Sequence, residues 1–299
     1  QTVYELLPND TDLTVFREHG VLGLNMAFID SSENYHTAKD NFANLNRDTA
    51  LHQFANMHAM LFALGNAELD ALAAPDAVFF DVFGLVVFVY DYALAWMGAL
   101  ICAALCGWLL YTAWRAGHVN VARFGIALAL VTVTAAVVIT VFAWTSDLFI
   151  ARIGTMAALG KKLYTGTFII AAMAAFMALA SLLQRRVGRG AITAAVLCLW
   201  LALLVATSIL LPKVSYIFLW PLLCVLLSQV LATQYIAKRH NLYSVLETFA
   251  YLPLVVLWAQ VAFALLLALN VADMHITLMP MLIAAALLWT SDVTARHET

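Results

Sequence analysis

The apolar residues of this 299-residue chain gather into long runs that begin near residue 92 and continue almost to the end. A membrane-spanning helix needs about 20 predominantly apolar residues. Runs of that kind, separated by loops with charges, Pro or Gly, predict seven spans, at residues 92–114, 121–143, 164–183, 191–211, 214–234, 247–269 and 275–291. The pattern therefore predicts a multi-pass α-helical membrane protein.

Residues 1–70 have the mixed pattern of a soluble segment. The stretch "DTDLTVFREHG" predicts a short helix, for which Asp10 or Thr11 can serve as N-cap and Gly20 as C-terminal cap. The stretch "VLGLNMAFI" that follows is nearly all apolar, which is typical of a strand buried on both faces of a parallel sheet. A helix followed by such a strand predicts part of an α/β domain.

A second helix is predicted in "RDTALHQFANMHAMLFALG", where apolar residues recur at helical spacing. Asp48 is a plausible cap for it, and Gly65 is suited to end it. One strand and two helices are too few to bury a core. We therefore expect residues 1–70 to be the C-terminal piece of an α/β domain whose sheet lies mostly upstream of Gln1.

Residues 71–91 connect the two parts. Their apolar stretch "AVFFDVFGLVVFVY" is rich in β-branched and aromatic residues and is interrupted by Asp81 and Gly84. It predicts a strand or an interfacial segment rather than a span. The expected organisation is thus 1–70 soluble, 71–91 connector and 92–299 transmembrane.

Composition and charge agree with this division. The chain is 64% apolar with a mean hydropathy of +0.90, and 13 of its 18 acidic residues lie at or before Asp91. The net charge of -3 and the lack of a basic cluster argue against a nucleic-acid partner and leave the lipid bilayer as the evident one. Loops rich in Lys and Arg stay on the cytoplasmic side of a membrane. Most Lys and Arg of the membrane part lie in loops that are cytoplasmic if residues 1–91 are on the non-cytoplasmic side, in a periplasm or an ER or vacuolar lumen.

Candidate chemistry lies in the polar loop "ENYHTAKDNFANLN", after the predicted strand. The carboxyl ends of strands in open α/β sheets bind ligands, and the loop contains His36, of the residue type that most often binds metals. The predicted topology can bring Asp12 to the same sheet edge, and Asp40 can cap the next turn or orient the loop. A single loop histidine is more often a surface residue, so the spacing by itself leaves both interpretations open.

These motifs resemble a known family. The series "NDTDLTVFREHGVLGLNMAFID" and "YHTAKDNFANL" is similar to the end of the di-zinc exopeptidases of the leucyl-aminopeptidase and glutaminyl-cyclase type, peptidase family twenty-eight. The resemblance is greatest to the membrane-anchored branch that contains the endoplasmic-reticulum metallopeptidase and vacuolar membrane protease group. There a "FFDVxG" segment precedes a polytopic region, as "FFDVFG" does here at Phe79–Gly84. One departure is Leu22, where the family usually has proline.

The resemblance implies a zinc-dependent, aminopeptidase-like exopeptidase with two zinc ions and a peptide substrate. It implies that His36 is the last zinc ligand and that Asp12 is a carboxylate near the metal and substrate that does not itself bind zinc. The family's other ligands and its general base would lie upstream of Gln1. Because a catalytic zinc needs about three protein ligands, we expect this chain to be inactive by itself.

Two alternatives remain for the function. The first is a non-catalytic membrane scaffold that keeps the fold of the peptidase. The second is a transporter-like membrane domain, although the centres of the seven expected spans contain no Asp, Glu, Lys or Arg. Substrate specificity and oligomeric state do not follow from the sequence.

Overall fold

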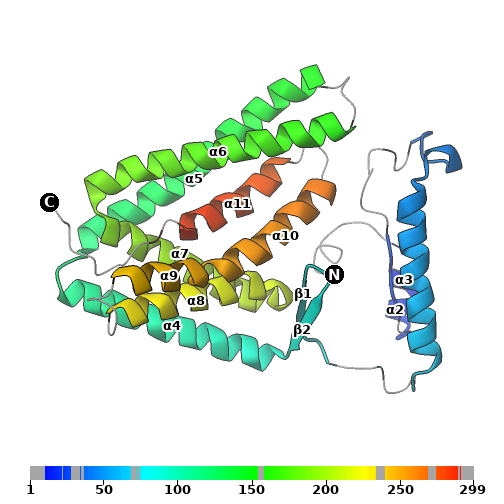
Figure 1. The fold of residues 1–299 in the computed structure, drawn as a ribbon, viewed down its shortest axis with the longest axis horizontal. Coiled ribbons are helices and arrows are strands. Elements are labelled where there is room, and N and C mark those ends of the chain that lie inside the picture. The colour runs from blue at the N-terminus through cyan, green and yellow to red at the C-terminus, as the bar shows by residue number, and fades with distance from the viewer. Residues whose placement is uncertain are drawn as a thin grey trace. The chain divides into compact units, whose positions relative to one another are not determined.

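The computed structural model describes residues 11–21, 23–27, 34, 37–68, 72, 75–153, 158–233, 240–268, 274–288 and 290. The chain divides into two compact units, residues 1–76 and residues 77–299. The elements of both units are labelled in Figure 1. Each unit is described by itself below.

The first unit contains two helices and a short turn. They are α2 (Asp12–Glu18), the 3₁₀ turn η2 (Phe42–Asn44) and α3 (Arg47–Gly65). Both helices expected from the sequence are present, and none of the described residues of this unit is buried.

The strand expected in "VLGLNMAFI" is not seen in its described part. Residues 21 and 23–27 have no regular secondary structure, and the rest of the stretch lies outside the described residues. A β-strand is defined by hydrogen bonds to a neighbouring strand. The one sheet in the described part of the chain is a hairpin within the second unit, so this segment has no partner strand there. The α/β character of residues 1–70 stays a prediction.

The second unit begins with a β-hairpin and continues as a helical bundle. The hairpin consists of β1 (Val78–Val82) and β2 (Val86–Tyr90), which pair antiparallel. The helical elements that follow are α4 (Tyr92–Arg115), α5 (Val121–Ile153), α6 (Ala158–Val187), α7 (Arg189–Leu210), the 3₁₀ turn η4 (Pro212–Val214), α8 (Tyr216–Leu231), α9 (His240–Ala250), α10 (Leu252–Ala268) and α11 (Met274–Leu288).

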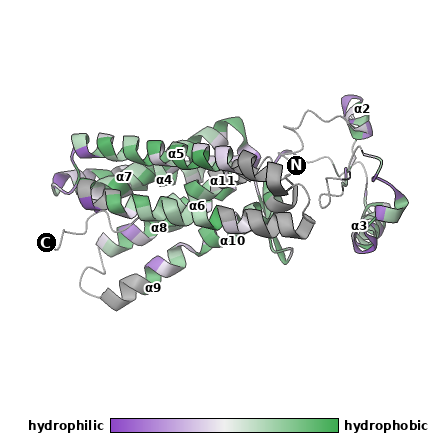
Figure 2. Ribbon diagram, turned by 90° about the horizontal axis from the view of Figure 1, so that it is seen from above, coloured by the Kyte–Doolittle hydropathy of each residue, from purple (hydrophilic) through white to green (hydrophobic). Residues whose placement is uncertain are grey.

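Six of the seven expected spans each overlap one of these α-helices, and the span 247–269 overlaps both α9 and α10. Within the described residues, four helices are long and apolar enough to cross a membrane, at Tyr92–Arg115, Val121–Thr145, Arg189–Leu210 and Val245–Leu265. Two shorter apolar helices, Ile169–Leu182 and Tyr216–Leu231, accompany them. Figure 2 shows the apolar colouring along α5, α7 and α8. The chain is therefore an integral membrane protein, and the count of seven crossings stays a prediction.

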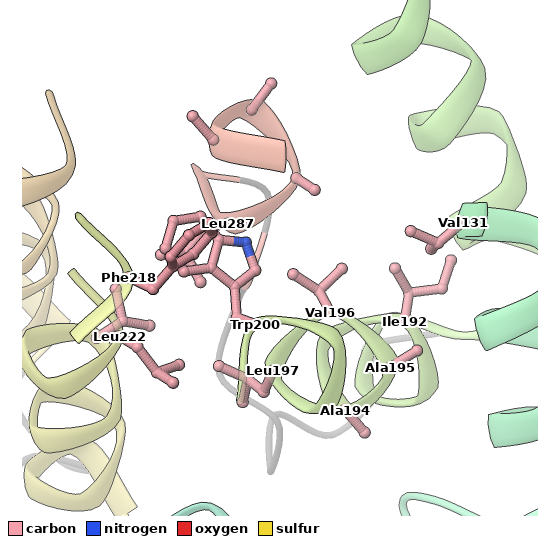
Figure 3. Close-up of a cluster of buried hydrophobic side chains, with 14 of the residues drawn as sticks. Val131, Ile192, Ala194, Ala195, Val196, Leu197, Trp200, Phe218, Leu222 and Leu287 are labelled. Carbon is pink, nitrogen blue, oxygen red and sulfur yellow. The ribbon is translucent and has the colours of Figure 1, made fainter. Parts of the chain in front are cut away.

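The core of the bundle lies around Trp200 of α7. Its ring is in edge contact with Phe218 of α8 and Trp258 of α10, at centroid distances of 5.4 and 5.8 Å. The Trp200 indole nitrogen donates to the carbonyl of Ile283 in α11 (3.0 Å), and the Trp258 nitrogen donates to that of Ile217 in α8 (3.0 Å). Figure 3 shows the Trp200 indole pointing from α7 toward Phe218 and Leu287. Both buried indole N–H groups are thereby paired, which ties four helices together.

Small residues allow close helix approach on one side of this core. A side chain at Gly98 of α4 would meet Leu219 of α8 at 2.8 Å, so the two helices approach closely at this point. Close contact at small residues is typical of helix packing in membranes. Lipid tails are as apolar as the side chains, so helices associate through close van der Waals packing rather than through the hydrophobic effect. The 3₁₀ turn η4, with Pro212 as its first residue, connects α7 and α8.

Candidate functional site

Asp12 begins helix α2. Thr11 is the N-cap, its N–H lies 3.5 Å from Oγ1 of Thr14, and the two residues form a capping box. Of the two N-cap candidates, Thr11 is confirmed. Asp12 is the acidic residue of the first turn and is exposed, where the helix dipole favours a negative charge. This favourable position accounts for an aspartate here with or without a nearby metal, so its assigned role stays a prediction.

The far end of α2 also follows the sequence pattern. Gly20 has a φ of +75° and its N–H donates to the carbonyl of Arg17 (3.0 Å). A left-handed residue after a helix is most easily supplied by glycine. Next to it, His19 donates a hydrogen bond from Nδ1–H to the carbonyl of Val15 (2.8 Å). This contact gives His19 a structural role at the C-terminal end of α2.

His36, the expected zinc ligand, lies outside the described residues. The described residues on either side of it, Asn34 and Thr37, are joined by two hydrogen bonds, because both the N–H and the hydroxyl of Thr37 donate to the Asn34 carbonyl (3.2 and 2.8 Å). The Thr37 hydroxyl also accepts from the N–H of Lys39 (3.2 Å). Thr37 therefore organises the turn next to the candidate ligand.

The rest of the loop is held by asparagine side chains. Asn41 caps η2 by accepting from the N–H of Asn44 (3.3 Å), and its own side-chain amide donates to the carbonyl of Ala38 (2.9 Å). Asn44 donates to the carbonyl of Lys39 (2.9 Å). Asp40 is exposed and contributes its backbone N–H to the Thr37 carbonyl (3.0 Å). The loop-orienting role of the Asp40 carboxylate stays a prediction.

Sequence reasoning missed these loop residues, although a signal for them was present. The segment has Asn or Thr at positions 37, 41, 44 and 46. Such side chains bond to nearby backbone groups and favour turns and caps. A search for asparagine at two- and three-residue spacing would have identified them.

Helix α3 is capped by a different residue from the one expected. The Asn46 side chain accepts from the N–H groups of Asp48 (2.9 Å) and Thr49 (3.2 Å), so Asn46 is the N-cap and Asp48 lies in the first turn. The prediction of Asp48 as the cap was thus wrong by two residues, because the side chain of Asn46 reaches two free N–H groups. The helix ends at Gly65 as predicted.

The histidines of α3 do not combine with other candidate ligands. His58 packs between Phe54 and Phe62, one helical turn away on each side, with ring centroids at 6.0 and 4.8 Å. His52 lies 3.5 Å from the amide of Asn56. Within the described part of the chain, no group of three or more His, Cys, Asp or Glu side chains could hold a metal ion. The described residues therefore do not make a complete zinc site by themselves.

Comparison with known proteins separates two parts of the chain. Residues 1–61 match the family model of Peptidase family M28. The matched region contains both the Asp12 segment and the Tyr35–His36–Thr37 loop, so the resemblance predicted from these motifs is confirmed for this part of the chain. The class that the findings define is an integral membrane protein whose N-terminal part is related to family M28 peptidases.

Individual relatives belong to the membrane-anchored branch. The chain is 33% identical over 90 residues to endoplasmic reticulum metallopeptidase 1 of Homo sapiens, which covers 28% of this chain and 10% of that protein. It is 32% identical over 90 residues to the protein of the same name from Rattus norvegicus, and this match also covers 28% of this chain and 10% of that protein. It is 39% identical over 51 residues to the vacuolar membrane protease of Candida dubliniensis, which covers 17% of this chain and 6% of that protein.

The matched segment thus spans about a tenth of the length of the metallopeptidases it resembles. No solved structure matches the chain. The activity of the whole protein is accordingly a matter for proposal.

Proposed function

We propose that this chain is a membrane-bound part of a zinc-dependent exopeptidase with aminopeptidase-like activity on peptides. The observation that carries the proposal is the family match of residues 1–61, because it includes the loop in which the resemblance assigns a zinc ligand. The names of the matched relatives, a metallopeptidase and a vacuolar membrane protease, support the same class.

In this proposal His36 binds one of two zinc ions through an imidazole nitrogen. Asp12 lies near the metal and the substrate and holds a hydrogen bond, and Asp40 orients the loop. Zinc in a hydrolase acts as a Lewis acid that polarises the scissile carbonyl. The remaining ligands and the general base come from sequence that precedes residue 1 in the complete protein, so the chain by itself has no peptidase activity.

The exposed faces of the first unit support an incomplete domain. Phe54, Leu61 and Phe62 of α3 are between 60 and 70% exposed, although large apolar side chains of a soluble domain normally pack against other elements. A sheet contributed by the preceding sequence would cover them. In the proposed topology, this unit lies on the non-cytoplasmic side of the membrane. The helices that follow cross the membrane seven times.

The test is the substitution His36→Ala in the full-length protein. We expect it to abolish hydrolysis of aminoacyl reporter substrates and to lower the bound zinc, measured by elemental analysis, because a lost imidazole ligand leaves the site short of its required donors. The matched control is His52→Ala, which removes an exposed histidine of α3. Zinc content equal to that of the unchanged protein would exclude His36 as a ligand.

The same measurements separate the alternatives. A full-length protein that binds no zinc and hydrolyses no reporter peptide supports the non-catalytic scaffold. A transporter-like role requires solute flux across vesicles that contain the membrane unit, and no such flux is expected of an anchor.

A further inference from the structure

The β-hairpin at the start of the second unit is apolar on both faces. In the register Phe80↔Phe88, alternate residues of the two strands form an inner face that includes the fully buried Val78. The opposite, outer face consists of Phe79 paired with Val89 and Asp81 paired with Val87. A sheet with one face in water normally alternates apolar and polar residues. Here three of the four outer residues are apolar.

These outer side chains are well exposed. Phe79, Val87 and Val89 are 48, 63 and 66% exposed, and at the tip Phe83 and Leu85 reach 61 and 83%. Such a cluster on a two-stranded ribbon indicates an interaction surface rather than scattered surface residues. The remaining question is which medium or partner covers it.

The inner face fastens the hairpin to the bundle. The Phe80 ring stacks on Tyr216 at the start of α8, with centroids 4.5 Å apart and planes within 8°. The Gln260 side-chain amide in α10 donates to the Asp81 carbonyl (3.2 Å). Tyr90 meets the Trp220 ring of α8 edge-on at 6.1 Å. The hairpin therefore has a fixed position relative to α8 and α10.

That position is the level at which the apolar helices begin. Asp91 directly follows β2 and caps α4 by accepting from the N–H of Leu94 (2.8 Å). Figure 1 shows the hairpin at the end of the bundle where α4 starts. Tyr90, Tyr216 and Trp220 gather at the same level, and tyrosine and tryptophan concentrate where the hydrocarbon of a bilayer meets its polar headgroups.

Exposed apolar residues continue from the hairpin into the surface of α4. Leu94, Met97 and Leu100 of this candidate span are 41, 53 and 68% exposed, as expected of side chains that face lipid. The outer face of the hairpin includes one exposed charge. Asp81 is the one charged residue between 78 and 90, and its carboxylate accepts from the N–H of Gly84 (2.7 Å) and lies 3.5 Å from the Gln260 amide.

We propose that the outer face and tip of the hairpin insert into the boundary between headgroups and acyl chains of the bilayer. The membrane contact of this protein then begins at Phe79 rather than at Tyr92. The hairpin acts as an interfacial anchor that fixes the depth and orientation of α4.

The test places a fluorescent probe at the tip. Leu85→Cys is labelled with an environment-sensitive maleimide in the full chain, reconstituted in phosphatidylcholine vesicles with or without brominated acyl chains. We expect the brominated lipid to reduce the emission at position 85 about as strongly as at a Leu100→Cys probe, and aqueous iodide to have little effect. Phe42→Cys, in the exposed loop of the first unit, is the aqueous control and should respond to iodide alone.

Two outcomes overturn the proposal. Quenching of the position-85 probe by iodide as strong as at position 42 would leave the tip in water. Resistance to both quenchers would mean that protein covers it, either the rest of the chain or a second copy. If the substitution at the tip disturbs the turn, Val87→Cys on the outer face of β2 repeats the measurement at a second position. The unsubstituted chain gives the background from the four native cysteines. The Leu100 probe in each preparation verifies that the bundle is inserted.

Discussion

The two units of this chain use similar amino acids in opposite ways. Between residues 11 and 76 none of the described side chains is buried, and Phe54 is 66% exposed. In the second unit Trp200, Leu204 and Leu222 are almost completely buried, although Leu100 on the outside of α4 is 68% exposed. Equal exposure has different meanings in the two units. On a membrane helix the solvent is lipid, whereas an apolar face of a soluble helix requires a protein partner.

The difference teaches what each unit obtains from its own sequence. Helices α2 and α3 form through local signals, namely the caps at Thr11 and Asn46. The bundle adds contacts between residues far apart in the chain, such as the Trp200 bond to Ile283 and the Tyr251 hydroxyl bond to the carbonyl of Thr290 (2.7 Å). Tertiary packing, more than helix propensity, stabilises most helices. The bundle should therefore be much the more stable of the two units within this chain.

The largest expected effect contrasts Trp200→Ala with Phe54→Ala. Removing the Trp200 ring leaves a cavity beside the rings of Phe218 and Trp258 and should lower the free energy of unfolding by about 3–5 kcal/mol. Phe54→Ala should change it by less than about 0.5 kcal/mol, because that ring is exposed here. Thermal unfolding in detergent measures the first effect through the reaction of the buried Cys102 and Cys106 with a thiol reagent. Hydrogen exchange at the N–H groups of α3 measures the second. Equal effects would refute the contrast between the units.

A second expectation concerns two glycines of the same helix. Gly98→Leu forces a side chain against Leu219, and overpacking of this kind costs about 1–3 kcal/mol. Gly107→Leu adds the same atoms where the new Cβ has nothing within 4 Å, and the loss of a helical glycine should even stabilise α4 by about 0.5–1 kcal/mol. The same unfolding measurement should give opposite signs. A loss of stability at position 107 would show that this face of α4 has a protein partner.

The smallest expected effect lies in the first unit. Asn46→Ala removes the cap of α3 and should cost about 1 kcal/mol locally, while Asp48→Ala, which removes the acidic residue of the first turn, should cost about 0.3–1 kcal/mol. Faster hydrogen exchange at the N–H groups of Asp48 and Thr49 reports the loss, and the unfolding midpoint of the bundle should not move. A larger effect from Asp48 than from Asn46 would contradict the cap that the structure assigns.

Helix positions could be predicted from the sequence because their signals are local. The limits of α2, the end of α3 at Gly65 and a helix in each expected span follow from capping residues and apolar run length. The strand expected in "VLGLNMAFI" could not be verified in the same way, because its hydrogen bonds depend on another strand. The cap of α3 was misplaced because several polar residues in succession can each cap, and side-chain geometry decides among them.

The candidate site was predictable only as far as its motif. The family match of residues 1–61 includes the Asp12 segment and the His36 loop, and both motifs are visible in the sequence. The loop contacts of Thr37, Asn41 and Asn44 required coordinates, because they depend on how the backbone turns between those residues.

The sequence by itself determined that this is a membrane protein with an N-terminal part related to family M28 peptidases, because apolar run length and motif order are properties of the chain alone. Only the tertiary structure decided that Trp200, Phe218 and Trp258 from three helices meet in one core, and that the apolar stretch before α4 folds back as a hairpin on Tyr216 and Gln260. Those contacts join residues up to 179 positions apart, and neither periodicity nor composition specifies which distant side chains will meet.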